Sequence, residues 1–239
     1  MRLKQTIVKA KKLIQTYNEE QLENVLYEGM KFVEEEQDIN IILSYLELCK
    51  EWGSIDNYEK ILRYSLNLKM PDQQRLEVLQ SFLDFINRER LFSAKGLERV
   101  ELLHECIKFS TQAMGIISED ITTVFTYLLS IRAEGYLDLA REGELNAAFL
   151  AYKDIKKYIN LIKKAETIPD HWNKDSLIAF KKIDLAETII ISKDDTAQAI
   201  TLLESAIQTI ETNQTKSWAT ERAYDLLDKA LILHENTMG

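Results

Sequence analysis

Glycine and proline are scarce in this chain, which contains only seven glycines and two prolines among its 239 residues. Short strands joined by tight turns need these residues repeatedly, because glycine supplies positive φ angles and proline fixes the first corner of many turns. A chain with so few of them lacks the turn chemistry of a β-sandwich or a β-barrel. The sequence therefore predicts a protein that is nearly all helix.

Acidic residues outnumber basic ones, 39 to 30, and give an acidic protein with a formal net charge of -9. Such a chain is not attracted as a whole to nucleic acid or to an anionic membrane, so neither is expected as a partner. No apolar run approaches the roughly 18 residues of a membrane span. Cys49 and Cys106 follow helical apolar spacing, which is typical of buried thiols and not of a disulfide framework. We expect a cytoplasmic protein.

Caps and chain breakers divide the sequence into eleven expected helices. They cover about residues 3–17, 19–36, 39–52, 54–68, 72–90, 97–115, 119–142, 145–165, 171–192, 195–212 and 217–236. Because the connections are short, neighbouring helices should run antiparallel. We expect a single elongated helical-repeat domain over residues 1–239, and the break at 93–96 is compatible with a subdivision near 91–96.

Several helix boundaries carry end signals. Asp38, Ser54, Ser118 and Asp195 each place a side-chain oxygen where the first turn of the following helix leaves backbone amides unpaired. Gly53 follows the third helix and is expected to close it in the left-handed conformation, which glycine adopts without strain. Each boundary is expected to hold within about two to four residues.

Three helix junctions share one pattern, in YLELCKEWGSIDNYEKILRYSL, GYLDLAREGELNAAFLAYKDI and LAETIIISKDDTAQAITLLESAI. Each has an apolar helix end, a tight turn, an apolar residue, a bulky residue four positions later and another residue three beyond. The positions are Gly53, Tyr58, Leu62 and Ser65; Gly143, Ala148, Tyr152 and Ile155; and Asp194, Ala199, Leu203 and Ala206. The pattern resembles the tetratricopeptide repeat (TPR), whose helix pairs use small residues at such positions so that backbones approach closely. The resemblance implies an all-α fold of antiparallel helical hairpins stacked into a curved array.

The second half of the chain, from about Ser118, is also similar to the last five helices of the 14-3-3 family in helix lengths and turn placement. In either architecture each hairpin buries its apolar face against its neighbours, so that the hairpins stack. The first helix of each pair generally lines the concave side. The inner helices would then be those at about 119–142, 171–192 and 217–236.

Each expected inner helix carries one base in the middle of an apolar stripe, namely Arg132, Lys182 and Arg222. Burying a lone charge costs several kcal/mol, so each base should either pair with an acid or face a wet groove. In the first case the partners would be acids such as Glu134, Asp138, Glu187 or Asp225. In the second, Arg132, Lys182 and Arg222 form one anion-receptive groove, and Tyr136 and Trp218 supply flat contact area. Both interpretations stay open.

A second basic feature lies in AYKDIKKYINLIKK, where Lys153, Lys156, Lys157, Lys163 and Lys164 share one arc of the expected helix. A solvated helix face is the plain interpretation, and a docking face for an acidic partner is the alternative. No aromatic residue interleaves with the lysines on that arc, which argues against single-stranded nucleic acid.

No catalytic or metal site is expected. The chain has no glycine-rich phosphate loop, no His-Glu-x-x-His and no nucleophile elbow. Of the three histidines, only His104 follows a glutamate, Glu101, at the spacing of a di-iron helix motif. We therefore expect neither a cofactor nor a metal.

These patterns together predict a noncatalytic binding module or scaffold whose concave groove receives an acidic or carboxylate-bearing segment of a protein or peptide. Two alternatives stay open. An inhibitor or immunity protein would use its acidic surface, such as Glu34, Glu35 and Glu36, against a basic partner. An all-helical enzyme would need a deep pocket with converging acids and bases. The sequence does not indicate the oligomeric state, since exposed apolar residues at the end of a helical array are compatible both with a cap and with a dimer contact.

Overall fold

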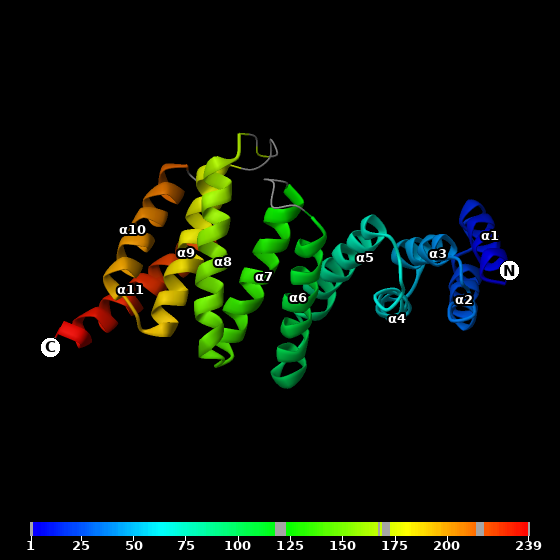
Figure 1. The fold of residues 1–239 in the computed structure, drawn as a ribbon, viewed down its shortest axis with the longest axis horizontal. Helices are drawn as coiled ribbons and strands as arrows, with labels where there is room; N and C mark the ends of the chain where they lie inside the picture. Colours follow the sequence, from blue (N-terminus) through cyan, green and yellow to red (C-terminus); the bar gives the residue numbers. More distant parts are fainter. Residues whose placement is uncertain (1, 118–122, 167, 169–172, 214–217, 239) are drawn as a thin grey trace. The chain divides into compact units, whose positions relative to one another are not determined.

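A computed structural model of the chain describes residues 2–117, 123–166, 168, 173–213 and 218–238. These residues form eleven α-helices and no strand, which confirms the all-α prediction (Figure 1). The chain divides into two compact units, Met1–Glu89 and Arg90–Gly239. The boundary lies just before residues 91–96; that the two units act as one elongated domain stays a prediction.

The first unit consists of short helices that pack on their sequence neighbours. They are α1 (Arg2–Gln15), α2 (Glu19–Gly29), α3 (Ile39–Trp52), α4 (Ile55–Ser65) and α5 (Asp72–Phe85), with a 3-10 turn at Met30–Phe32 and a π-helical turn at Ile86–Arg90. Leu26, Tyr45 and Phe82 are fully buried and form part of its core. The expected second helix, about 19–36, is shorter because the chain changes to 3-10 geometry at Met30.

The expected caps of the first unit are confirmed, but the closing glycine is not as predicted. Asp38 accepts a hydrogen bond from the amide of Asn40, and Ser54 accepts one from Asn57. Gly53 is extended, with φ -90° and ψ 169°, so the left-handed prediction is wrong. Its amide still bonds to the carbonyl of Cys49, and a Cβ atom at this position would lie 2.7 Å from that same oxygen. Glycine is needed here for close approach and not for a positive φ.

Another close approach, at Gly29, leads to a stability prediction. A Cβ atom on Gly29 would lie 2.5 Å from the hydroxyl oxygen of Tyr45 and 2.8 Å from Cγ2 of Thr6. Tyr45 is buried and donates to the carbonyl of Leu26, so it cannot give way freely. We expect Gly29→Ala to lower the free energy of unfolding by about 1–3 kcal/mol. Gly115→Ala is the matched control, because nothing lies within 4 Å of a Cβ there. It should be neutral or slightly stabilising; equal urea midpoints for the two variants would contradict the prediction.

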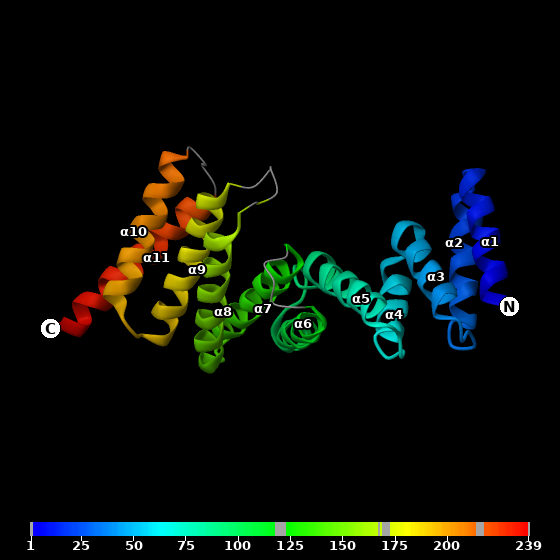
Figure 2. The same ribbon diagram turned by 45° about the horizontal axis from the view of Figure 1, so that its top comes forward.

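The second unit consists of longer helices, in which each packs against the next along the sequence (Figures 1 and 2). They are α6 (Gly96–Ile116), α7 (Thr123–Arg141), α8 (Leu145–Lys164), α9 (Lys174–Ser192), α10 (Thr196–Thr212) and α11 (Trp218–Met238). Asp195 caps α10 as predicted, and Asn173, which the sequence interpretation missed, caps α9. The predicted cap at Ser118 lies outside the described residues.

The junction residues chosen from the sequence lie where the helices of a pair meet. Ala148 and Ile155 on α8, and Ala199 and Ala206 on α10, are at most 1% exposed. The turn after α7 contains Gly143 at φ 104°, where glycine is the favoured residue. Alanine side chains thus let consecutive helices approach closely, as the repeat pattern indicates.

Candidate binding cavity

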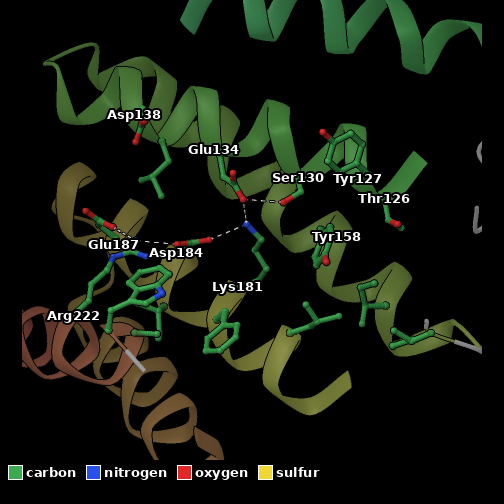
Figure 3. A pocket seen from close by; sticks show the side chains of 18 of the residues that line it. Thr126, Tyr127, Ser130, Glu134, Asp138, Tyr158, Lys181, Asp184, Glu187 and Arg222 are labelled. Carbon is green, nitrogen blue, oxygen red and sulfur yellow. Dashed lines mark hydrogen bonds and ion pairs between the residues drawn. The ribbon is translucent and has the colours of Figure 1, made fainter. Parts of the chain in front are cut away.

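A cavity of about 900 Å³ opens in the second unit between α7, α9 and α11. These are the helices that the sequence predicts for the inner face, and they supply most of the lining residues; α8 and the chain after it complete the wall. The volume lies within the range of small-molecule and peptide pockets. Figure 3 shows the lining side chains that converge on this space.

More than half of the described lining is apolar, aromatic or uncharged. Besides the ionisable groups described below, it includes Thr123, Thr126, Tyr127, Tyr158, Ile162, Ala165, Ile168, Leu177, Phe180, Trp218 and Ala219. Trp218 is 72% exposed at the first turn of α11, and Tyr127 is 39% exposed on α7. Exposed aromatic side chains beside a cavity give large contact area at a small cost in conformational entropy.

The lining also carries a chain of alternating charges. Lys181 Nζ on α9 donates to Glu134 Oε1 on α7 at 2.6 Å and to Asp184 Oδ2 at 3.1 Å (Figure 3). Ser130 Oγ also donates to Glu134 Oε1, at 2.9 Å. Lys181 and Asp184 are buried, whereas the side chain of Glu134 is 57% exposed. Glu134 is therefore the carboxylate of this group that a bound molecule can reach most easily.

The same chain continues to α11 and back to α7. Arg222 Nη2 donates to Asp184 Oδ1 at 2.9 Å and also to Glu187. Arg141 Nη2 then donates to Glu187 Oε2 at 2.6 Å, and Arg141 Nη1 to Asp138 Oδ1 at 2.5 Å. Each of the three bases described in the lining is thus shared between two acids, and the contacts join α7, α9 and α11.

The pKa values follow from this arrangement. Burial would raise the pKa of Asp184, but Lys181 and Arg222 together hold it below its ordinary value. Burial would also raise the pKa of Glu187, but hydrogen bonds from Arg141 and Arg222 outweigh this effect, so the pKa of Glu187 is lowered as well. Burial would lower the pKa of Lys181, yet Asp184 and Glu134 raise it. These groups are therefore all charged at neutral pH.

Among the described residues of the lining, acids outnumber bases by one. The acids are Glu134, Asp138, Asp184 and Glu187, and the bases are Arg141, Lys181 and Arg222. Each base already faces two carboxylates, so an anion entering this space would displace an internal partner. An entering cation would instead find the exposed oxygens of Glu134.

The five site residues expected from the sequence do not lie together. Arg222 and Trp218 line the cavity. Arg132 faces away from it and binds Asp154 on α8 through two hydrogen bonds, of 2.7 and 2.8 Å. Lys182 donates to Ser205 Oγ on α10 at 2.6 Å and lies in a separate, smaller hollow. Tyr136 packs into the core against Leu137 and its neighbours.

Their separation has a simple structural reason. A helix in the middle of a stacked array is packed on several sides, so an apolar stripe does not by itself mark its inner face. The stripe around Lys182 faces α10, and the side of α9 that faces the cavity is one residue away, at Lys181. Adjacent residues on a helix point about 100° apart, and this difference separates the two lysines.

Sequence reasoning missed several residues of the cavity, among them Lys181, Asp184 and Phe180. One signal was present: Lys181, Asp184 and Glu187 recur at three-residue spacing, which places them on the same face of a helix. Buried charges at such spacing on one helix, together with acids on another, indicate a polar network within a helical array.

Metal ligands, membrane-spanning helices and reactive thiols were considered next, for the described part of the chain. No group of three or more His, Cys, Asp or Glu side chains there is placed to hold a metal ion. None of the described helices is both long and apolar enough for a bilayer crossing. Both cysteines are buried, and burial raises the pKa of Cys49 to about 11 and that of Cys106 to about 12. Neither thiol is activated as a nucleophile.

The chain matches no protein-family model and no curated protein. Among solved structures it is similar to BtubC (BKLC) from P. vanneervenii, at a TM-score of 0.46 and 13% identity, over 100% of this chain and 93% of that one. It is also similar to the de novo designed helical repeat protein DHR64, at a TM-score of 0.18 and 17% identity, over 98% and 94%. At these TM-scores neither likeness carries an argument about fold or function.

Proposed function

We propose that the protein is a noncatalytic, TPR-like binding module whose cavity takes an apolar segment of a partner protein or peptide. The observation that supports this proposal is the aromatic part of the cavity lining, which contains the exposed rings of Trp218 and Tyr127 together with Phe180 and Tyr158. Large aromatic side chains around a preformed hollow are characteristic of binding hot spots. A stacked helical array is also the kind of fold that presents such hollows.

The charges of the cavity favour a basic residue next to the apolar part of the segment. The sequence led us to expect an acidic or carboxylate-bearing partner, on the interpretation in which Arg132, Lys182 and Arg222 form one groove and are not paired internally. In the structure Lys181 and Arg222 are each held by two carboxylates, and acids outnumber bases among the described residues of the lining. A lysine or arginine of the partner would bind Glu134 and the faces of the aromatic rings.

A binding role fits these groups better than acid–base catalysis does. A general acid or base works best when its pKa lies near the operating pH. Here the pKa values of Asp184 and Glu187 are lowered and that of Lys181 is raised, so each moves away from neutrality. The ion pairs therefore support the cavity wall and its charge, and they are not adjusted for proton transfer.

Selection of a random peptide library against the full-length protein tests this function. We expect the selected peptides to combine a lysine or arginine with leucine or an aromatic residue. They should bind Trp218→Ala at least about tenfold more weakly, which corresponds to about 1.4 kcal/mol. Trp52→Ala, at a 42% exposed tryptophan of the first unit, is the matched control and should bind normally.

Two results would reject the cavity. Peptides that bind Trp218→Ala and Trp52→Ala equally well would place the site elsewhere. Loss of partner binding only in Glu34→Lys/Glu35→Lys, two exposed acids of the first unit, would favour the inhibitor alternative.

A further inference from the structure

A second surface, on the opposite side of α8 from the cavity, carries most of the positive charge of this helix. Tyr158 and Ile162 of α8 line the cavity. Lys153, Lys156 and Lys164 lie about half a turn away around the helix and are exposed. The helix contains five lysines and a single acid, Asp154, which is buried and held by Arg132. Its outer face is therefore strongly basic in an otherwise acidic protein.

The face is furrowed and partly apolar. A shallow hollow of about 530 Å³ runs along it, lined by Phe149, Tyr152, Lys153, Lys156, Lys157, Asn160, Leu161 and Lys164. The ring of Phe149 is 60% exposed, and the ammonium of Lys153 lies 4.3 Å from its centroid. The ammonium of Lys156 lies 5.5 Å from the centroid of Tyr152. Exposed rings next to lysines provide apolar contact and charge in one place.

The lysines are available for a partner. Within the described part of the chain, Lys153, Lys156 and Lys164 form no ion pair with any acid. The only acid of α8 is already neutralised, and Glu144, just before the helix, bonds to His104. A surface with several cations that have no ion-pair partner favours a negatively charged partner.

We propose that this furrow of α8, defined by Phe149, Lys153, Lys156 and Lys164, docks an acidic segment of a partner polypeptide. The carboxylates of the segment bind the three ammonium groups, and a leucine or aromatic side chain of the segment packs on Phe149. The surface is independent of the cavity, because the two use opposite sides of α8 and prefer segments of opposite charge.

An acidic peptide fits this surface better than an extended polyanion such as a membrane or a duplex does. Exposed charges are screened beyond about 8–10 Å at physiological ionic strength, so a short segment in the furrow responds mainly to the local lysines. A bilayer or nucleic acid spans a much larger area and meets the net charge of -9 of the whole chain. A furrow also accommodates one chain along its length, whereas a planar bilayer touches only its rims.

Fluorescence anisotropy with the full-length protein tests the proposal. The probes are a fluorescein-labelled peptide of glutamate and leucine residues and the same peptide with glutamine in place of glutamate. We expect the glutamate peptide to bind at least about tenfold more tightly. Lys153→Glu/Lys156→Glu/Lys164→Glu should remove this preference. Lys9→Glu/Lys11→Glu/Lys12→Glu, three exposed lysines of α1, changes the net charge equally and should bind the glutamate peptide within about twofold of the wild type.

Equal binding of the two peptides by the wild-type protein would overturn the proposal. So would equal loss in both triple variants, because the effect would then reflect net charge and not this face. Vesicles of phosphatidylserine and phosphatidylcholine are the third probe; if they bind and the peptide does not, and the α8 variant abolishes that binding, the face contacts membranes instead. Helical circular dichroism checks each variant for folding, and Lys153→Gln/Lys156→Gln/Lys164→Gln provides a milder version without added repulsion.

Discussion

Replacement of Asp184 by alanine should lower the free energy of unfolding by about 3 kcal/mol. Asp184 is only 8% exposed and accepts from Lys181 and Arg222, two bases that are themselves largely buried. Removing one partner of a buried ion pair leaves an uncompensated charge, which costs about 3–5 kcal/mol in known cases. The lower end applies here, because Lys181 keeps Glu134 and Arg222 keeps Glu187. Urea unfolding followed by circular dichroism measures the change.

The pH dependence of stability separates this electrostatic effect from simple loss of packing. Folding lowers the pKa values of Asp184 and Glu187 below their ordinary 3.8 and 4.5. The carboxylates therefore stabilise the fold fully above these values, and the contribution is lost as the pH falls through the lowered ones. Between neutral pH and about pH 3 the wild type should lose more stability than Asp184→Ala does. Asp228→Ala, at an exposed acid of α11, is the control and should lie within about 0.5 kcal/mol of the wild type. Parallel pH curves for wild type and Asp184→Ala would contradict this account.

Truncation of Leu203 is expected to be as damaging as loss of Asp184. Leu203 is fully buried on α10, in a cluster with Ala199, Ala206 and Ala223 that joins α9, α10 and α11. The small alanines around it hold the helices close, so they cannot fill the space that a shorter side chain leaves. We expect Leu203→Ala to cost about 2–5 kcal/mol, measured as a shift of the urea midpoint.

Leu145→Ala provides the matched control for that substitution. Leu145 opens α8 and is 63% exposed, so the same change of side chain removes little buried area. It should alter the free energy of unfolding by less than about 1 kcal/mol. If Leu203→Ala were equally mild, the alanine-rich interface would be less tightly packed than its burial indicates.

The fold could be predicted from the sequence largely because its signals are local. Asp38, Ser54 and Asp195 cap helices through contacts two or three residues away, which a sequence displays directly. Ala199 and Ala206 follow a spacing that only a helix brings onto one face. The left-handed conformation predicted for Gly53 was wrong for a related reason. A glycine after a helix indicates where the helix ends, but it does not indicate which backbone conformation the glycine adopts.

The site could not be predicted in the same way, because its pairings are long-range. Arg132 pairs with Asp154, which is 22 residues away in the sequence, and Lys181 pairs with Glu134, which is 47 residues away. No local pattern says which acid will face which base once the helices stack. Arg222 and Trp218 were identified because α11 has neighbours on fewer sides, so that its apolar stripe does mark the inner face.

The alternating charges between α7, α9 and α11 also fix the positions of these helices along one another. Sliding α9 by a single turn, about 5.4 Å, would separate Lys181 from Glu134 and Asp184 from Arg222 at the same time. The spacing of the cavity walls is therefore fixed before any guest arrives. A bound segment must then match a cavity of fixed width. Selectivity for partners would come from the rigidity of the cavity and not from a change of its shape on binding.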